Sequence, residues 1–128
     1  MKELICHLIG DYLLQSDWMA SEKVKRFHVA LTHGLFYSLP FLFLSPTKTQ
    51  ILIIAVSHAV IDRWRIAKYV VYFKNFISPV SYWYKWDECS ITGYNKSRPD
   101  WLAVWLMIIA DNTLHLVINH FTLAWVKG

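Results

Sequence analysis

Apolar residues gather into four segments along the chain, and polar or basic residues separate each segment from the next. The segments run from Leu4 to Ala20, from His28 to Ser45, from Gln50 to Trp64 and from Trp101 to Val126. A helix needs about 20 predominantly apolar residues, within a range of about 17–25, to cross a bilayer. The second and fourth segments meet this length, and the first and third are marginal. The pattern predicts an all-α, membrane-embedded bundle of about four helices.

An aromatic and polar stretch lies between the third and fourth segments, from Phe73 to Trp101. It contains Pro79, Gly93 and Pro99, which favour turns. We therefore predict an interfacial loop with a short helix here, and the third helix can continue into it as far as Phe73. No repeat of fixed period interrupts the chain, so residues 1–128 are interpreted as a single domain.

The composition favours lipid over water as the surrounding medium. The chain is 55% hydrophobic and only 17% charged over 128 residues, and it holds seven Trp and seven Tyr. A small water-soluble domain has a large surface for its volume and needs many charges to cover it. Tryptophan and tyrosine are enriched at the headgroup level of membranes. The alternative is a soluble helical domain with an apolar partner-binding face.

The basic residues are distributed unevenly between the two sides of the predicted bundle. Three follow the first segment (Lys23, Lys25, Arg26) and seven follow the third, whereas the opposite side keeps only Lys2, Lys48 and Lys127. Basic loops stay in the cytoplasm, so both ends of the chain are predicted to lie outside. Because these charges flank apolar segments and form no stripe, we expect no nucleic-acid partner.

Three of the four apolar segments carry a histidine and an aspartate four residues apart, and the remaining segment carries His33 without an acidic partner. The pairs and the single residue are His7 with Asp11, His58 with Asp62, Asp111 with His115, and His33. Residues four apart lie on one face of a helix, one turn above each other. The seven side chains can therefore converge if the helices pack together.

Convergence on a metal is the interpretation that best explains so many polar groups in apolar helices. An Asp at the centre of a membrane helix costs at least ~2.5–3.5 kcal/mol on insertion scales. Imidazole and carboxylate are natural ligands for zinc first, and also for manganese or iron. Seven candidates exceed the need of one tetrahedral ion, so one or two divalent ions are expected. Some aspartates can instead orient a ligand imidazole.

Two further groups of residues bear on the chemistry. Arg63, Arg65 and Lys68 follow Asp62 and are candidate phosphate-binding residues, although cytoplasmic anchoring explains them equally well. Cys6 and Cys89 have no CxxC spacing, so neither a disulfide framework nor a thiolate zinc site is indicated.

The sequence also resembles a known family. The stretches HLIGDYLLQSDWMASEK, THGL, SHAVID and ADNTLH resemble the bacterial and phage family called domain of unknown function 3307, in the expected order and over nearly the whole chain. More distantly, they are similar to the membrane-bound metal-dependent hydrolases of the LexA-regulated set. The resemblance implies a multi-pass protein of the bacterial inner membrane with metal-binding His and Asp at the seven positions above. Hydrolase activity is implied by analogy alone.

Three functions follow from these observations. The first is a metal-dependent hydrolase at the cytoplasmic membrane face, in which Asp11, Asp62 and Asp111 are ligands or, in one case, the general base, and the substrate is a lipid-linked phosphate or ester. The second is a carrier of protons or divalent metal. The third is a non-enzymatic membrane protein with a structural metal that binds a host protein. A homo-oligomer is compatible with each.

Overall fold

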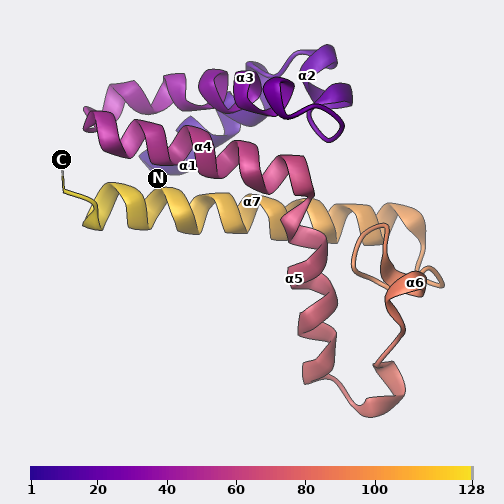
Figure 1. Ribbon diagram of the computed structural model, residues 1–128. Coiled ribbons are helices and arrows are strands. Elements are labelled where there is room, and N and C mark those ends of the chain that lie inside the picture. The colour runs from indigo at the N-terminus through magenta and orange to yellow at the C-terminus, as the bar shows by residue number, and fades with distance from the viewer. Residues whose placement is uncertain (128) are drawn as a thin grey trace. The chain divides into compact units, whose positions relative to one another are not determined.

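Residues 1–127, which the computed structural model describes, form helices and connecting turns, and no strand occurs among them. The all-α class predicted from the sequence is therefore confirmed. Packing divides the chain into two compact units, residues 1–64 with 115–127 and residues 65–114. The last helix, α7 (Asp100–Trp125), contributes to both units (Figure 1). Compact units within one chain are not necessarily separate domains, so the single-domain interpretation stays a prediction.

The first unit contains most of the predicted apolar segments. It consists of α1 (Lys2–Leu8), the π-helical turn η1 (Ile9–Leu13), α2 (Asp17–Glu22), α3 (Phe27–Ser38), the 3₁₀ segment η2 (Leu39–Leu44), α4 (Lys48–Trp64) and the second half of α7. Each predicted apolar segment is thus helical over most of its length. The fourth agrees with α7 to within one residue at each end.

The first apolar segment is shorter as a helix than its sequence suggests. The helical run stops after Leu13, and α2 begins separately at Asp17. Ser16 causes the restart, because its side-chain oxygen accepts a hydrogen bond from the backbone N–H of Met19 at 3.3 Å and caps the new helix. Lys2–Leu13 rises roughly 18 Å, well short of a ~30 Å hydrocarbon core.

Helices α3 and α4 pack side by side at very close range. A Cβ added to Gly34 of α3 would lie 2.3 Å from the backbone oxygen of Ala55 of α4 and 3.3 Å from the Cβ of Ala59. Small residues at one face let two helix backbones approach in this way. The contact fixes the neighbouring positions His33 and His58 relative to each other.

Both ends of the described chain lie at the same end of the first unit (Figure 1). The Gln50 side-chain amide donates to the backbone oxygens of Leu123 and Val126 at 3.2 and 2.9 Å, which joins the start of α4 to the end of α7. His120 of α7 pairs with Glu3 of α1 at 3.2 Å. Beneath these contacts, Cys6, Tyr37, Phe41 and Ile54 form the hydrophobic core.

The second unit begins at Arg65, where helix α4 has ended and the backbone φ of 49° lies in the left-handed region. It contains α5 (Ile66–Lys74), η3 (Asn75–Ile77), η4 (Val80–Tyr82), α6 (Trp86–Cys89) and the first half of α7. Buried Val71 of α5 packs on the turn at Gly93, where a Cβ would lie 2.7 Å from the Val71 Cβ. The stretch predicted as a loop with a short helix thus contains η3, η4 and α6 joined by turns.

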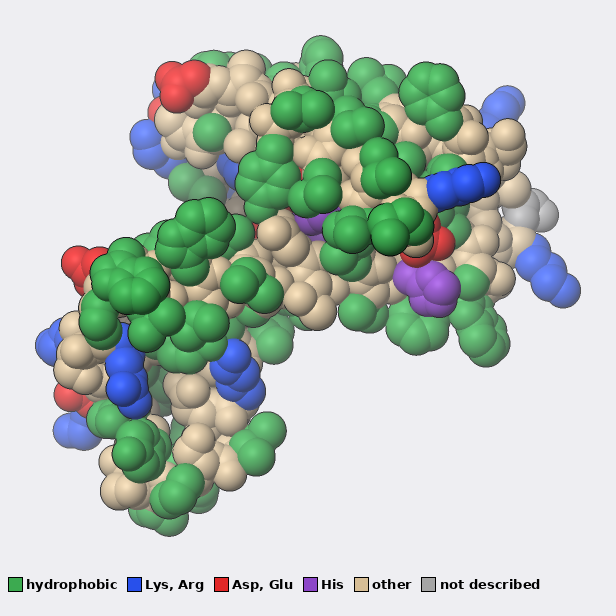
Figure 2. All heavy atoms as spheres, turned by 180° about the vertical axis from the view of Figure 1, so that it is seen from behind, with side chains coloured by type: hydrophobic (Ala, Val, Ile, Leu, Met, Phe, Trp, Pro, Cys, Tyr) green, Lys and Arg blue, Asp and Glu red, His purple; other side chains and the backbone are tan. Residues whose placement is uncertain are grey.

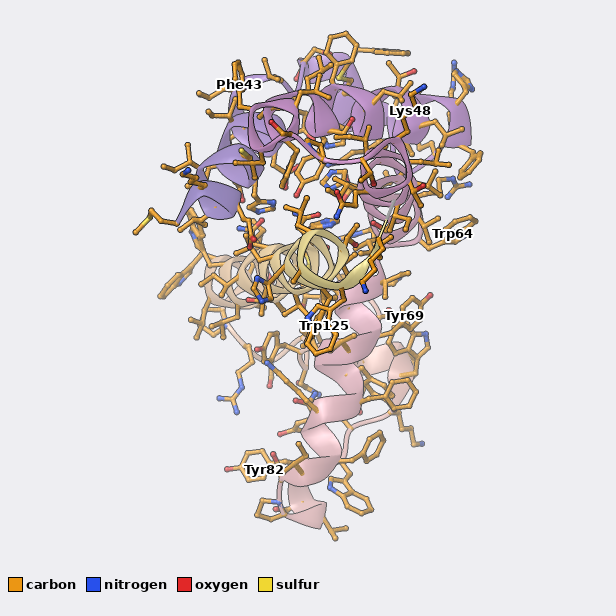
Figure 3. All side chains as sticks on the ribbon, turned by 90° about the vertical axis from the view of Figure 1, so that its left-hand side faces the viewer. Phe43, Lys48, Trp64, Tyr69, Tyr82 and Trp125 are labelled. Atoms are coloured by element: carbon orange, nitrogen blue, oxygen red, sulfur yellow. The ribbon has the colours of Figure 1, made fainter. Side chains whose placement is uncertain are left out.

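Two helical segments, Phe27–Leu44 and Asp100–Trp125, are long and apolar enough to cross a membrane by length and composition. Large apolar side chains are exposed over much of the molecule, and hydrophobic atoms dominate the face drawn in Figure 2. Phe43 and Trp125 project away from the ribbon in Figure 3 and are 91% and 74% exposed. The structure thus supports membrane association at the level of these two helices.

Candidate metal centre

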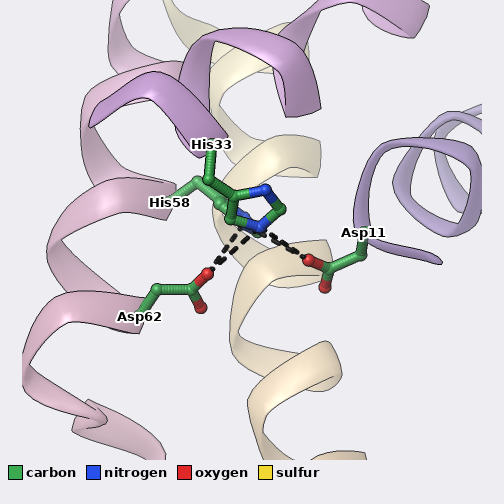
Figure 4. A group of neighbouring side chains, drawn as sticks. All are labelled: Asp11, His33, His58 and Asp62. Atoms are coloured by element: carbon green, nitrogen blue, oxygen red, sulfur yellow. Dashed lines mark hydrogen bonds and ion pairs between the residues drawn. The ribbon is translucent and has the colours of Figure 1, made fainter. Parts of the chain in front are cut away.

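Four buried side chains of the first unit converge on one point. Asp11 from η1 and Asp62 from α4 lie on opposite sides of His33 from α3 and His58 from α4 (Figure 4). One atom from each residue, the Nε2 of each histidine and one oxygen of each carboxylate, lies within 4.8 Å of the other three. We refer to Asp11, His33, His58 and Asp62 as the four-residue group. This group can hold a metal ion.

The spacing of the four atoms fits metal coordination. His33 Nε2 lies 3.2 Å from Asp11 Oδ1 and 3.3 Å from Asp62 Oδ2, and His58 Nε2 lies 3.4 and 3.2 Å from the same two oxygens. The two Nε2 atoms are 2.9 Å apart. With bonds of about 2.0–2.1 Å, neighbouring ligand atoms lie roughly 3.3 Å apart in a tetrahedron and roughly 2.9 Å apart in an octahedron. The observed distances cover this interval.

The chemistry of the four atoms also suits a cation. The Nδ1 atoms of His33 and His58 are buried and contact no hydrogen-bond partner, so the polar contacts of both rings are made through Nε2. Two carboxylate oxygens and two imidazole nitrogens therefore point at a common centre. Carboxylates buried away from water are stable only when a cation or several donors compensate them.

Two more predicted histidines contact the outer carboxylate oxygens of the group. His115 Nε2 lies 3.3 Å from Asp62 Oδ1, and His7 Nε2 lies 3.9 Å from Asp11 Oδ2. Both histidines are buried. They are placed to orient the carboxylates or to add ligands, as the sequence analysis expected of such residues.

Tyr37 of α3 holds the rings in place and was not expected from the sequence. Its ring stacks on His58 with centroids 3.6 Å apart, and its hydroxyl lies 2.8 Å from His7 Nδ1. The Asn119 amide donates to the same hydroxyl at 2.6 Å. Tyr37 is completely buried. A polar residue amid the apolar segment HGLFYSLPF was the available signal, but tyrosine alone does not indicate a site.

Local structure explains how Asp11 reaches the centre. Residues Ile9–Leu13 form a π-helical turn, with the Leu14 N–H bonded to the Ile9 carbonyl at 3.0 Å. π-Helical turns are rare overall, but those that occur are often found at functional sites. They widen the helix and change the direction of a side chain. A Cβ at Gly10 would lie 2.7 Å from the Tyr37 backbone oxygen, so glycine permits this turn to lie against α3.

A lysine enters the site from the turn after α2. Lys23 Nζ donates to Asp62 Oδ2 at 2.6 Å and to Gln15 Oε1 at 2.6 Å, and its side chain is only 16% exposed. From the sequence, Lys23 belongs to the basic turn predicted to face the cytoplasm, and this contact was not expected. Nothing in the linear pattern could show it, because Lys23 lies in the turn after α2 and Asp62 lies on α4, far away in sequence.

Two of the predicted phosphate-binding residues, Arg63 and Lys68, contact backbone oxygens within their own units. Arg63 Nη1 donates to the Val24 backbone oxygen at 2.8 Å, which ties α4 to the turn that carries Lys23. Arg65 and Lys68 belong to the second unit, where Lys68 Nζ donates to the Ser90 oxygen at 3.3 Å and lies over the Trp86 ring. Asp111, one turn before His115 on α7, is described with that unit as well. Their roles stay predictions.

The two cysteines take no part in the four-residue group. Both are buried and free, and Cys6 belongs to the hydrophobic core. Burial raises the pKa of the Cys89 thiol, and the nearby carboxylates of Glu88 and Asp87 raise it further. A thiol in these surroundings stays protonated at neutral pH and is a poor metal ligand or nucleophile.

A family model described as "Protein of unknown function (DUF3307)" matches residues 1–118. The chain belongs to this family. The matched region contains every member of the four-residue group together with His7, Lys23, Tyr37 and His115. No curated protein and no solved structure matches the chain. Membership therefore assigns no reaction, and the function has to be argued from the site.

Proposed function

We propose that the chain is a multi-pass inner-membrane protein whose four-residue group holds a divalent metal and hydrolyses a phosphate or other ester at the cytoplasmic membrane face. The observation that carries the proposal is the convergence of two imidazole nitrogens and two carboxylate oxygens at coordination spacing. A bound divalent ion would supply Lewis acidity that polarises an ester or phosphoryl oxygen and acidifies a water molecule. The chain's own residues supply position and charge.

Each side chain has a distinct task in this proposal. His33 and His58 would hold the ion through Nε2, and the Tyr37 ring fixes the plane of His58 by stacking. Asp11 and Asp62 bring the negative charge that a divalent cation requires. His115 and His7 keep the outer oxygens of these carboxylates in place. Asp111 remains the third carboxylate of the predicted set and is the candidate general base.

The membrane setting is supported by the distribution of apolar surface. Beyond the two candidate spans, the second unit exposes Phe73, Ile77 and Val80 by 65%, 89% and 71%. Lys74 and Lys85 flank this uncharged stretch. Apolar side chains bordered by lysine suit the interface between headgroups and acyl chains. A lipid-linked substrate could reach the site from the same environment.

Zinc, manganese or iron would suit the four-residue group, and the identity of the ion decides the function. Two Asp and two His saturate a tetrahedral zinc, which is the arrangement of a structural site. An octahedral manganese or iron keeps two positions for water and substrate with the same four ligands. If the ion is zinc with no open position, the four protein ligands favour a second candidate function. The chain would then be a membrane interaction protein with a structural metal.

Metal analysis of detergent-purified protein tests the proposal. We expect about one equivalent of metal per four-residue group in the wild type and loss of most of it in Asp11→Asn and His58→Ala. His28→Ala, at an exposed histidine outside the group, should keep it. Chromogenic phosphate monoesters and diesters and a lipid phosphate are then offered with each metal. Metal-free wild type that stays monodisperse after zinc, manganese and iron are added would refute the metal site.

A separate outcome distinguishes the two candidate functions. Hydrolysis that disappears on chelation and in Asp11→Asn supports the enzyme. The structural role is supported by stoichiometric metal without hydrolysis of any ester, if X-ray absorption spectroscopy also shows a tetrahedral metal with no water ligand.

A further inference from the structure

Lys23 occupies a built position at the edge of the four-residue group. It caps the C-terminus of α2, whose Met19 is buried in the first unit. The next residue, Val24, accepts a hydrogen bond from Arg63, the neighbour of Asp62 in sequence. The turn that carries Lys23 is thus fixed to the helix that carries Asp62. The 2.6 Å contact between Lys23 Nζ and Asp62 Oδ2 follows from this arrangement.

Hydrogen-bond capacity leaves Lys23 able to bind one more acceptor. A lysine ammonium has three donors. Asp62 Oδ2 and Gln15 Oε1 take two of them, and no other acceptor for Lys23 is found among residues 1–127. Asp62 Oδ2 has two lone pairs, so it can accept from Lys23 while it faces the centre of the group. The third donor can therefore serve a ligand bound beside the metal.

The positive charge of Lys23 favours an anionic ligand at this position. Within the four-residue group, two carboxylates offset the charge of a divalent ion, and the Lys23 ammonium places a further positive charge beside Asp62. A largely buried ammonium group is stabilised by anionic acceptors. An anionic oxygen that lies between Lys23 and the ion would compensate it.

We propose that Lys23 is the anion-binding residue of this site and that the ligand it receives is the phosphoryl oxygen of a phosphate ester. This inference rests on the proposed function and makes it more specific, since it selects phosphate esters over neutral carboxylic esters. Gln15 acts as the positioning residue that holds the Lys23 ammonium toward Asp62. The role expected of Arg63, Arg65 and Lys68 from the sequence passes to Lys23.

The test measures binding of inorganic phosphate to metal-loaded, full-length protein by calorimetry, beside metal content. Lys23→Met removes the charge, Lys23→Arg keeps it, and Lys25→Met is the matched control at an exposed lysine paired with Glu22. We expect Lys23→Met to retain its metal and to bind phosphate roughly tenfold or more weakly, because one charge-assisted hydrogen bond is lost. Lys23→Arg should recover most of the affinity, and Lys25→Met should match the wild type.

Three results would overturn the inference: wild-type protein that holds metal but binds no phosphate, Lys23→Met that binds phosphate as tightly as the wild type, or Lys23→Met that loses its metal. Gln15→Leu provides a second variant that keeps the charge and should weaken phosphate binding by a smaller factor. Phosphate binding that depends on Lys23 without hydrolysis of any ester would sink the proposed hydrolase while leaving the anion site intact.

Discussion

At the residue scale, the four-residue group depends on side chains that are not candidate ligands themselves and that contact its members from distant positions in the sequence. Tyr37 links His7 and Asn119 through one hydroxyl and supports His58 with its ring. Partners of this kind keep ligand rings oriented, and their loss typically lowers metal affinity 10–100-fold. Tyr37 is therefore expected to matter for metal affinity although it is not itself a candidate ligand.

Removal of the Tyr37 hydroxyl separates orientation from packing. Tyr37→Phe retains the stacked ring but removes the buried hydroxyl that His7 Nδ1 and the Asn119 amide contact, which should lower the free energy of unfolding by about 1–3 kcal/mol. Metal affinity, measured by competition with a chromogenic chelator, should fall about tenfold or more. Tyr82→Phe, at an exposed tyrosine of the second unit, is the control. Unchanged chelator competition in Tyr37→Phe would contradict the orienting role.

At the element scale, the site is formed by the close approach of α3 and α4 and by the π-turn η1. His33 and His58 meet because Gly34 and Ala55 let the two backbones approach. Asp11 meets them because a π-turn replaces a regular helical turn. Neither feature follows from hydrophobic periodicity, which predicts helices but not the distance between them.

A methyl group at Gly34 tests the first of these features. In Gly34→Ala the new Cβ would collide with the Ala55 backbone oxygen, so α3 has to move away from α4. Overpacking of this kind costs about 1–3 kcal/mol of stability. It should also separate the two Nε2 atoms and reduce metal content well below that of the wild type. Leu35→Ala, the exposed neighbour, should retain full metal. A Gly34→Ala protein with wild-type metal content would show that the site tolerates the displacement.

At the scale of the whole molecule, a bound ion would join η1, α3 and α4, and through His115 also α7. A ligand that binds only the folded state stabilises it by roughly 4 kcal/mol at a thousand times its dissociation constant. Stripping the metal also leaves two buried carboxylates without their cation. We therefore expect chelation to lower the midpoint of thermal unfolding, followed by tryptophan fluorescence, and metal addition to restore it. Asp11→Asn should unfold at a midpoint that chelator does not change.

The placement of the chain ends gives a prediction about topology. The described ends of the chain and the start of α4 lie together in the first unit, away from the turn that carries Lys23 and Arg26. If the basic side faces the cytoplasm, a C-terminal alkaline phosphatase fusion should be active and a C-terminal green fluorescent protein fusion dark. A fusion that ends at Lys74 should give the reverse. A fluorescent full-length fusion would place the ends inside and invert the proposed orientation.

The sequence by itself determined the helical class, the bounds of α7 to within one residue at each end and the His and Asp members of the four-residue group. It could do so because helical periodicity and a spacing of four are local properties of the chain. His58 and Asp62 share a helix face wherever that helix packs. The linear pattern predicted one apolar segment from Leu4 to Ala20, but Ser16 caps a new helix and divides it. The tertiary structure alone decided that Asp11 and His33 meet Asp62 and that Lys23 and Tyr37 belong to the site. Those contacts join residues that lie far apart in sequence, and they depend on how closely the helices pack.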